Sequence, residues 1–266
     1  MKTRLFCSLV VGSTAVSAPV SLTAQAIDSI AALDSTSPIP PADSLLTEFS
    51  LPPQVVGYLA ALTDSFPDTP LRMGLLPTGM VEAEIASVYV RIAGRDSADV
   101  RNMTRNMRHV IHAIDPDLVD GGLGLGYGFK RAVEGVRTYT QLAASTPGAS
   151  EALLYHAPFI DGATTSALSR ADDALALARQ IETSQAEPQE ILERLEDLGE
   201  MIRGMAFGSD RDRDGRIGND ASESGLAQAQ YHLALIRSVA GLAPAPPLPA
   251  SLPIPVFVRD PTGVGR

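Results

Sequence analysis

The chain has one cysteine, no tryptophan and few aromatic residues of any kind. Phenylalanine and tyrosine make up 5% of its 266 residues. An intramolecular disulfide is excluded because Cys7 has no second cysteine to pair with. The fold must therefore depend on the burial of apolar side chains. Hydrophobic residues make up 45% of the chain, which is enough for one globular domain at this length.

Positive charge is also scarce. Lys and Arg number 21 against 31 Asp and Glu, which gives a formal net charge of −10 at pH 7. An acidic surface repels nucleic acid and anionic lipid, because these carry charge of the same sign. We therefore expect no nucleic-acid partner, whereas a cation would be attracted.

The familiar motifs of catalysis are missing. The chain contains neither Gly-x-Ser-x-Gly nor His-Glu-x-x-His. Residues 121–128 are rich in glycine, but Phe129 stands where a dinucleotide-binding fingerprint needs its third glycine, and no strand pattern precedes them. We interpret this run as a loop between helices, and we identify no catalytic residue.

The N-terminus has the pattern of an export signal. Lys2 and Arg4 precede a short, mostly apolar stretch, and Ala24 and Ala26 supply small residues at the two positions that a signal peptidase reads. The apolar stretch is interrupted by serine, threonine and glycine, so we expect no stable membrane span. The pattern predicts a cleaved signal peptide at residues 1–26 and a secreted or periplasmic protein.

Proline divides the rest of the chain into three parts. Residues 27–80 form a proline-rich N-terminal segment and residues 243–266 a proline-rich tail, neither of which suits a helix interior or a central strand. Residues 81–242 lie between them and are expected to hold the folded core.

Within this core, apolar residues recur at helical spacing and strand signals are nearly absent. The expected helices cover residues 82–93, 99–114, 127–144, 150–183, 188–205 and 224–241. Pro158 and Gly162 are expected to kink or break the long helix at residues 150–183. Short loops between these helices favour antiparallel neighbours, so the sequence predicts an all-α fold, a helical bundle.

Residues 210–217 read Asp-Arg-Asp-Arg-Asp-Gly-Arg-Ile and are the only segment that points to a specific chemistry. Ca²⁺ takes about six to eight oxygen ligands at ~2.3–2.6 Å. Asp210, Asp212 and Asp214 alternate along the chain, so all three carboxylates can point at one ion. Gly215 follows where the chain must reverse through a backbone angle that other residues adopt at a cost. The pattern predicts a calcium-binding loop.

The pattern resembles the calcium loop of the EF-hand family, which here covers residues 210–221 between two of the expected helices. The resemblance implies that the three aspartates supply side-chain ligands and that Arg216 supplies its backbone carbonyl. It also implies a helix-loop-helix unit near the C-terminus. Family members carry a bidentate glutamate at the twelfth position, where this chain has Ala221.

Two acidic residues lie close enough in sequence to replace that glutamate. Asp220 stands at the eleventh position and Glu223 at the fourteenth. Glu223 would reach the ion only if the exit helix starts about half a turn late. With a side-chain ligand missing, we expect a dissociation constant of about 10⁻⁴ to 10⁻³ M, as in extracellular modules, and a site that is structural.

EF-hand loops usually work in pairs, and this chain has only one. Ile217, at the position where paired loops form a short β contact, has no second loop to meet within the chain. Two arrangements remain open: the loop leans on its own bundle, or two chains pair as a homodimer.

The four histidines offer an alternative chemistry. His109 and His112 are three residues apart on one expected helix, so they share a face and have the spacing to chelate a transition metal or flank a haem. His156 and His232 would complete such a site if the bundle brought all four together. The alternative prediction is thus a histidine-based metal-binding or haem-binding bundle.

Overall fold

The computed structural model describes residues 51–247, and these residues form helices with no strand among them. This confirms the all-α helical bundle. The signal peptide expected at residues 1–26, most of the proline-rich N-terminal segment and the end of the tail lie outside the described residues. The α-helices are α1 (Pro53–Thr63), α2 (Leu75–Ala93), α3 (Val100–Ile114), α4 (Phe129–Ser145), α5 (Glu151–Glu182), α6 (Pro188–Phe207) and α7 (Leu226–Val239). Two short 3-10 helices, η2 (Pro70–Arg72) and η3 (Pro116–Leu118), lie in the connections.

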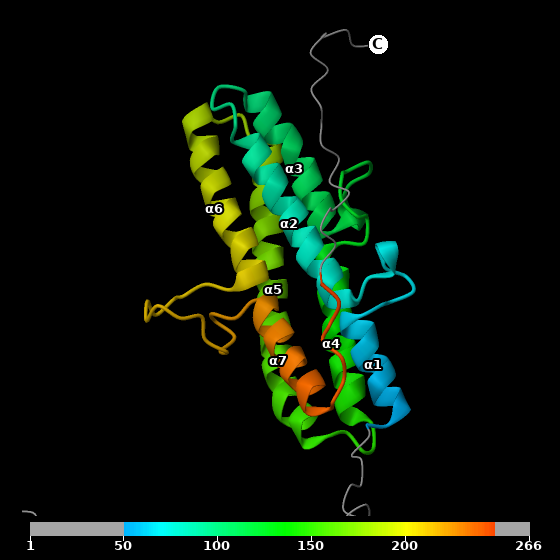
Figure 1. Ribbon diagram of the computed structural model, residues 1–266. Coiled ribbons are helices and arrows are strands. Elements are labelled where there is room, and N and C mark those ends of the chain that lie inside the picture. Colours follow the sequence, from blue (N-terminus) through cyan, green and yellow to red (C-terminus); the bar gives the residue numbers. More distant parts are fainter. Residues whose placement is uncertain (1–50, 248–266) are drawn as a thin grey trace, which may run out of the picture. The chain divides into compact units, whose positions relative to one another are not determined.

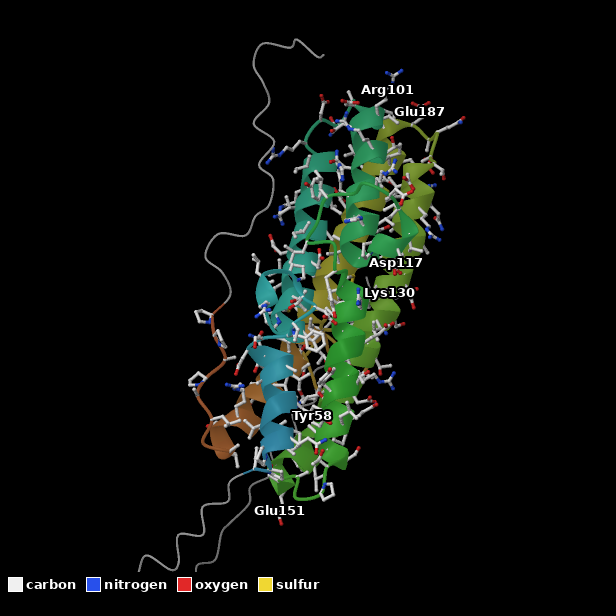
Figure 2. All side chains as sticks on the ribbon, turned by 90° about the vertical axis from the view of Figure 1, so that its right-hand side faces the viewer. Tyr58, Arg101, Asp117, Lys130, Glu151 and Glu187 are labelled. Atoms are coloured by element: carbon white, nitrogen blue, oxygen red, sulfur yellow. The ribbon has the colours of Figure 1, made fainter. Side chains whose placement is uncertain are left out.

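The bundle is organised along α5, which has 32 residues and is therefore about 48 Å long. The first half of α5 packs against α4 and α7, and its second half packs against α3 and α6 (Figure 1). Helix α2 contacts α3 and α6 as well as α4 and α7, so it joins the two groups of helices. Figure 2 shows this span: Glu151, the first residue of α5, lies at the opposite end from Arg101 of α3 and Glu187 just before α6.

Each helix has a buried and an exposed face, and α3 shows this most clearly. Met103 and Met107 are completely buried, as are the apolar residues near its end, while Arg101 and Arg105 are exposed. The methionines serve as core filler. Among residues 51–247, no helix combines the length and the apolar character needed to cross a membrane.

The proline-rich N-terminal segment, predicted to end at residue 80, contributes directly to the bundle. Val55, Leu59 and Leu62 of α1 are fully buried. Pro53 is the first residue of α1, a position where a proline lacks no hydrogen bond and already has a helical backbone angle. Helix α2 likewise starts at Leu75, before the expected residue 82, with Pro77 in its first turn. The prolines here begin helices, so the folded core starts well before residue 81.

Of the kink or break expected at Pro158, the break does not occur: α5 is continuous through that residue. Proline removes one N–H, and the carbonyl that loses its donor belongs to Leu154, four residues earlier. Leu154 is 52% exposed, so this turn of α5 lies at the surface of the bundle. Gly162 also lies inside the helix.

The glycine-rich run at residues 121–128 wraps around a buried carboxylate. Glu82 of α2 is fully buried and accepts hydrogen bonds from the backbone N–H groups of Leu125, Tyr127 and Gly128, at 3.2, 3.1 and 3.0 Å. Gly128 is the N-cap of α4 and has no side chain to cap the helix, so the Glu82 carboxyl group takes this role by accepting the Gly128 N–H. Burial raises the pKa of Glu82, while these N–H groups and His112 oppose the rise. The run is a loop that caps α4.

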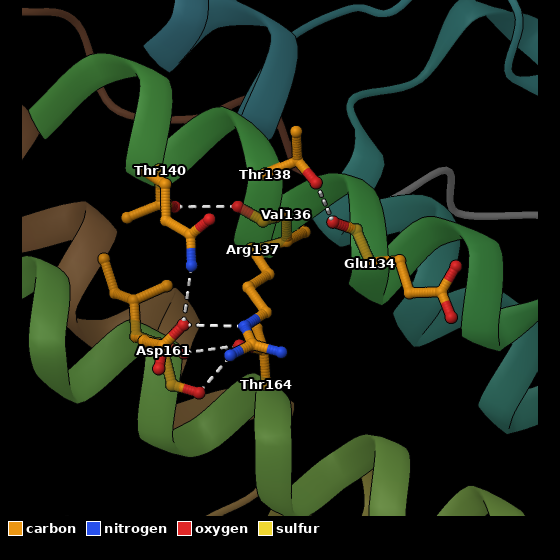
Figure 3. A network of polar contacts seen from close by, with 9 residues as sticks. Glu134, Val136, Arg137, Thr138, Thr140, Asp161 and Thr164 are labelled. Carbon is orange, nitrogen blue, oxygen red and sulfur yellow. Dashed lines mark hydrogen bonds and ion pairs between the residues drawn. The ribbon is translucent and has the colours of Figure 1, made fainter. Parts of the chain in front are cut away.

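Polar contacts between α4 and α5 lie on the surface (Figure 3). Arg137 Nε donates to Asp161 Oδ1 at 2.7 Å, and Gln141 donates to the same oxygen at 3.1 Å. Both partners of the ion pair are about 40% exposed, and exposed pairs contribute about 0–1 kcal/mol. The two helices are therefore held together mainly by apolar burial.

The burial of α1 can be tested by truncating one of its side chains. Replacing Leu59 by alanine leaves a cavity in the core, so the free energy of unfolding should fall by about 2–5 kcal/mol. Leu154→Ala, at an exposed position of α5, should change it by less than about 0.5 kcal/mol. Urea denaturation followed by circular dichroism measures both. Equal effects of the two substitutions would show that α1 is not part of the core.

Candidate metal centre

The calcium-loop sequence lies between α6 and α7, in residues 208–225, and its two ends are pinned together. Ser209 N–H donates to the Glu223 carbonyl at 2.8 Å. Gly208 has a φ of 81°, and its backbone lies very close to residue 223. A Cβ atom on Gly208 would be 2.3 Å from the Glu223 carbonyl oxygen. Only glycine fits this position. The loop therefore has a narrow base from which residues 210–222 extend.

Within the loop, backbone N–H groups turn towards the aspartates. Asp210 accepts from the N–H groups of Asp214 and Gly215, at 3.2 and 2.9 Å, and Asp212 accepts from Asp214 at 3.0 Å. Gly215 has a φ of 83°, the left-handed conformation expected at the sixth position of the motif. Arg213 also has a positive φ, 64°. The chain thus reverses around the carboxylates of Asp210 and Asp212.

Glu223 reaches back to the start of the loop. Its Oε1 accepts from the N–H groups of Arg211 and Asp212, at 2.9 and 3.1 Å, and its Oε2 accepts from Gly218 at 2.8 Å. The side chain is buried, with 6% of the residue exposed. Helix α7 begins at Leu226 and not at residue 224, which leaves Glu223 in the loop. This late start is the condition under which Glu223 was expected to reach the site.

Three carboxylates meet as a result. Oxygen atoms of Asp210, Asp212 and Glu223 all lie within 4.8 Å of one another. Two oxygens on opposite sides of a calcium ion are about 4.6–5.2 Å apart, twice the usual bond length. The three residues are therefore close enough to bind one cation of that size.

The other predicted ligands lie in the same loop but outside this group of three. Asp214 Oδ1 accepts from the Arg216 N–H at 2.7 Å, and Arg216 itself is exposed. Asp220 accepts from the Ser222 N–H and forms the turn before α7. Hydrogen bonds from Ser222 lower the pKa of Asp220.

The surroundings of Glu223 and Asp212 shift the pKa values of these two carboxylates in opposite directions. The N–H groups of Gly218, Asp212 and Arg211 hold the pKa of Glu223 below its ordinary value. The Asp214 N–H acts in the same direction on Asp212, but partial desolvation and the nearby carboxylates outweigh it, so the pKa of Asp212 is raised. A negative charge on Asp212 is thus opposed by its neighbours. A bound cation would relieve this repulsion.

Arg170, in the middle of α5, fixes the base of the loop. Its Nη1 donates to the carbonyls of Gly204 and Ser224, at 2.7 and 2.8 Å, and its Nη2 donates to the Ser222 carbonyl at 2.7 Å and the Ser209 hydroxyl at 3.1 Å. Burial and the nearby Arg211 lower the pKa of Arg170, and Glu223 raises it. An arginine in an alanine-rich helix gives no sequence signal of such a role, so this residue was missed.

The four histidines form two separate pairs. His156 on α5 and His232 on α7 face each other with their Nδ1 atoms 2.9 Å apart. His109 on α3 accepts a hydrogen bond from the Leu123 N–H at 3.1 Å, and Nδ1 of His112 is buried without a hydrogen-bond partner among the described residues. Within residues 51–247, no group of three or more potential metal ligands includes a histidine. The structure thus does not bring all four imidazoles to one site.

Comparison with known proteins adds no relative. No family model matches the chain, and no curated protein and no solved structure matches it.

The role of Arg170 can be tested by replacing it with methionine, which keeps much of the side-chain length but removes the donors. Three backbone carbonyls and a hydroxyl then lose a charged donor, and such hydrogen bonds contribute about 1.5–3 kcal/mol each. The free energy of unfolding without calcium should fall by at least about 1.5 kcal/mol. Arg203→Met, at an exposed position of α6, is the matched control and should have little effect. If both variants are equally stable, Arg170 does not stabilise the base of the loop.

The lowered pKa of Glu223 predicts a dependence of stability on pH. A carboxylate with a lower pKa in the folded protein stabilises it above the unfolded pKa of about 4.3, and this contribution is lost as the pH falls through the folded value. Urea denaturation at pH 7 and pH 3 in a chelator should therefore show a smaller loss of stability for Glu223→Gln than for the unsubstituted chain. Asp197→Asn, at an exposed position of α6, should show the full loss. An identical loss in all three proteins would contradict the assignment.

Proposed function

We propose that this protein binds Ca²⁺ through the loop between α6 and α7, and that the ion serves to fix the loop in the helical bundle. The main support is the approach of Asp210, Asp212 and Glu223 to within 4.8 Å of one another. The order of residues that resembles an EF-hand loop supports the choice of calcium, because hard carboxylate and carbonyl oxygens suit this ion. The expected signal peptide supports an exported protein, which would meet more calcium than a cytosolic one.

In the proposed site Glu223 replaces the glutamate that EF-hand loops carry at the twelfth position. It is anchored by three backbone N–H groups, so its position does not depend on the ion. Asp214 and the Arg216 carbonyl join the ligand set by small rotations, and water completes it, with Asp220 as a further neighbour. Because the oxygens of Glu223 already accept hydrogen bonds, they bind the ion less strongly than a free bidentate carboxylate. The proposed dissociation constant is about 10⁻⁴ to 10⁻³ M.

Support for a structural role comes from how the loop is attached. Arg170 of α5 ties its base to the end of α6 and the start of α7, so an ion that orders residues 210–222 would act on a loop joined to the bundle. Ile217 leans on the same base, since a Cβ atom on Gly208 would lie 2.7 Å from its side chain. This contact favours the first of the two arrangements, in which the loop is supported within its own chain. Ile217 is still 38% exposed, which leaves a homodimer through this residue as the second arrangement.

Calcium binding can be measured by calorimetry and by thermal melting. Calcium should bind at about one equivalent and raise the unfolding temperature, because 1 mM calcium at a dissociation constant of about 10⁻⁴ to 10⁻³ M adds about 0.4–1.4 kcal/mol. Asp212→Asn and Glu223→Gln should both lose most of this rise. Magnesium should be a weaker ligand, since it demands a smaller octahedral site.

Asp197→Asn provides the control for charge alone, because it removes one exposed carboxylate of α6 outside the loop. It should keep the calcium response of the unsubstituted chain. The proposal fails if calcium at several millimolar gives no heat and no shift, or if all three variants respond alike. Asp212 is exposed, so its replacement tests the site even if Glu223→Gln loosens the loop.

A further inference from the structure

A second pair of potential metal ligands lies between α5 and α7, away from the acidic loop in sequence and in chemistry. His156 and His232 face each other through the same ring nitrogen, with Nδ1 atoms 2.9 Å apart. Phe159 stacks on the His232 ring at 4.8 Å with an interplanar angle of 11°. Tyr155 and Tyr231 lie edge-on beside the two imidazoles and are exposed. The pair is thus held in place by aromatic rings.

The pair contributes little as a structural contact. A neutral hydrogen bond adds about 0.5–1.5 kcal/mol, whereas an unpaired buried polar atom costs about 1–3 kcal/mol. His232 is 3% exposed, and its Nε2 has no hydrogen-bond partner among residues 51–247. Two apolar side chains would join α5 to α7 at least as well. Stability alone therefore does not account for two imidazoles at this position.

The two nitrogens are 2.9 Å apart because one ring donates a hydrogen bond to the other. If both rings turn so that their Nδ1 lone pairs face one ion at this separation, the distance fits one kind of metal geometry. Imidazole nitrogens bind metals at ~2.0–2.1 Å, so nitrogens 2.9 Å apart subtend an angle of about 90° at a shared ion. A tetrahedral ion would need a separation of about 3.3 Å. An angle of about 90° is that of square-planar or tetragonal coordination, which is typical of Cu²⁺ and Ni²⁺.

We propose that His156 and His232 bind one Cu²⁺ ion through their Nδ1 atoms, with water at the other positions. Cu²⁺ is chosen over Ni²⁺ because it binds nitrogen ligands more strongly. His156 is only half-buried, so solvent and the ion can reach the pair. The site is separate from the calcium loop, whose carboxylate oxygens suit a harder ion.

The protonation of the pair allows this binding without loss of a proton. In the free pair one imidazole donates Nδ1–H to the other. With the ion bound, both rings carry their proton on Nε2, so one ring changes tautomer. Burial, with His156 nearby, lowers the pKa of His232, which favours the neutral ring that a metal requires. Its Nε2–H then lacks the acceptor that usually orients a metal-bound imidazole, which limits the affinity.

The test is a Cu²⁺ titration of the full chain, followed by calorimetry and electron paramagnetic resonance, in millimolar calcium. A tetragonal spectrum with coupling to two nitrogens is expected. His156→Asn and His232→Asn should each bind Cu²⁺ at least about tenfold more weakly and lose this coupling. His109→Asn, His112→Asn and Asp197→Asn should bind it as the unsubstituted chain does.

Circular dichroism without metal shows whether each variant folds, and the half-buried His156 gives the decisive variant if His232→Asn does not. The proposal is overturned if His156→Asn keeps the affinity and the two-nitrogen spectrum. It is also overturned if the coupling disappears with His109→Asn or His112→Asn, because the copper would then belong to the pair on α3.

Discussion

The arrangement of the C-terminal half of the chain depends on one guanidinium group. Arg170 projects from the middle of α5 and donates to the carbonyls of Gly204, Ser222 and Ser224 and to the hydroxyl of Ser209. Gly204 lies in the last turn of α6, and Ser224 lies just before α7, so one side chain ties the end of one helix to the start of the next. Helix α6 packs with α2 and with the second half of α5, while α7 packs with its first half. The junction between the end of α6 and the start of α7 is therefore fixed by polar contacts of Arg170. Within each group, the helices are held together by their apolar core.

Two loops of this protein are built around a carboxylate that accepts backbone N–H groups. In the glycine-rich loop, Glu82 accepts three such hydrogen bonds and caps α4, so the acceptor that the loop surrounds belongs to the protein itself. In the loop between α6 and α7, Glu223 takes three hydrogen bonds in the same way. The difference is that Asp210 and Asp212 bring further negative charge to Glu223. The raised pKa of Asp212 reflects this excess, and it is the electrostatic reason for proposing a cation there.

The helices were predictable because each depends on local spacing of apolar residues, and five of the seven appear close to their expected ranges. Prolines misled the prediction at α1, because a proline in the first turn begins a helix instead of preventing one. At Pro158 a break was one of the two expected outcomes, and α5 continues through that residue. The three aspartates and Gly215 were also readable from local order. The position of Glu223 was stated as a condition, since it depends on where α7 begins. Arg170 and the partners of Glu82 could not be found, because residues far apart in sequence come together only through packing. The pairing of His156 with His232, and the separation of both from His109, have the same origin.

The central claim is that Asp210, Asp212 and Glu223 share one calcium ion. A crystal structure of the protein grown with millimolar calcium tests it most directly, because Ca²⁺ is identified by its density and by its bond lengths. The account predicts one ion at ~2.3–2.6 Å from an oxygen of each of these residues, with Asp214 or the Arg216 carbonyl among the remaining ligands. A structure at the same calcium concentration in which the three carboxylates contact only water would contradict it.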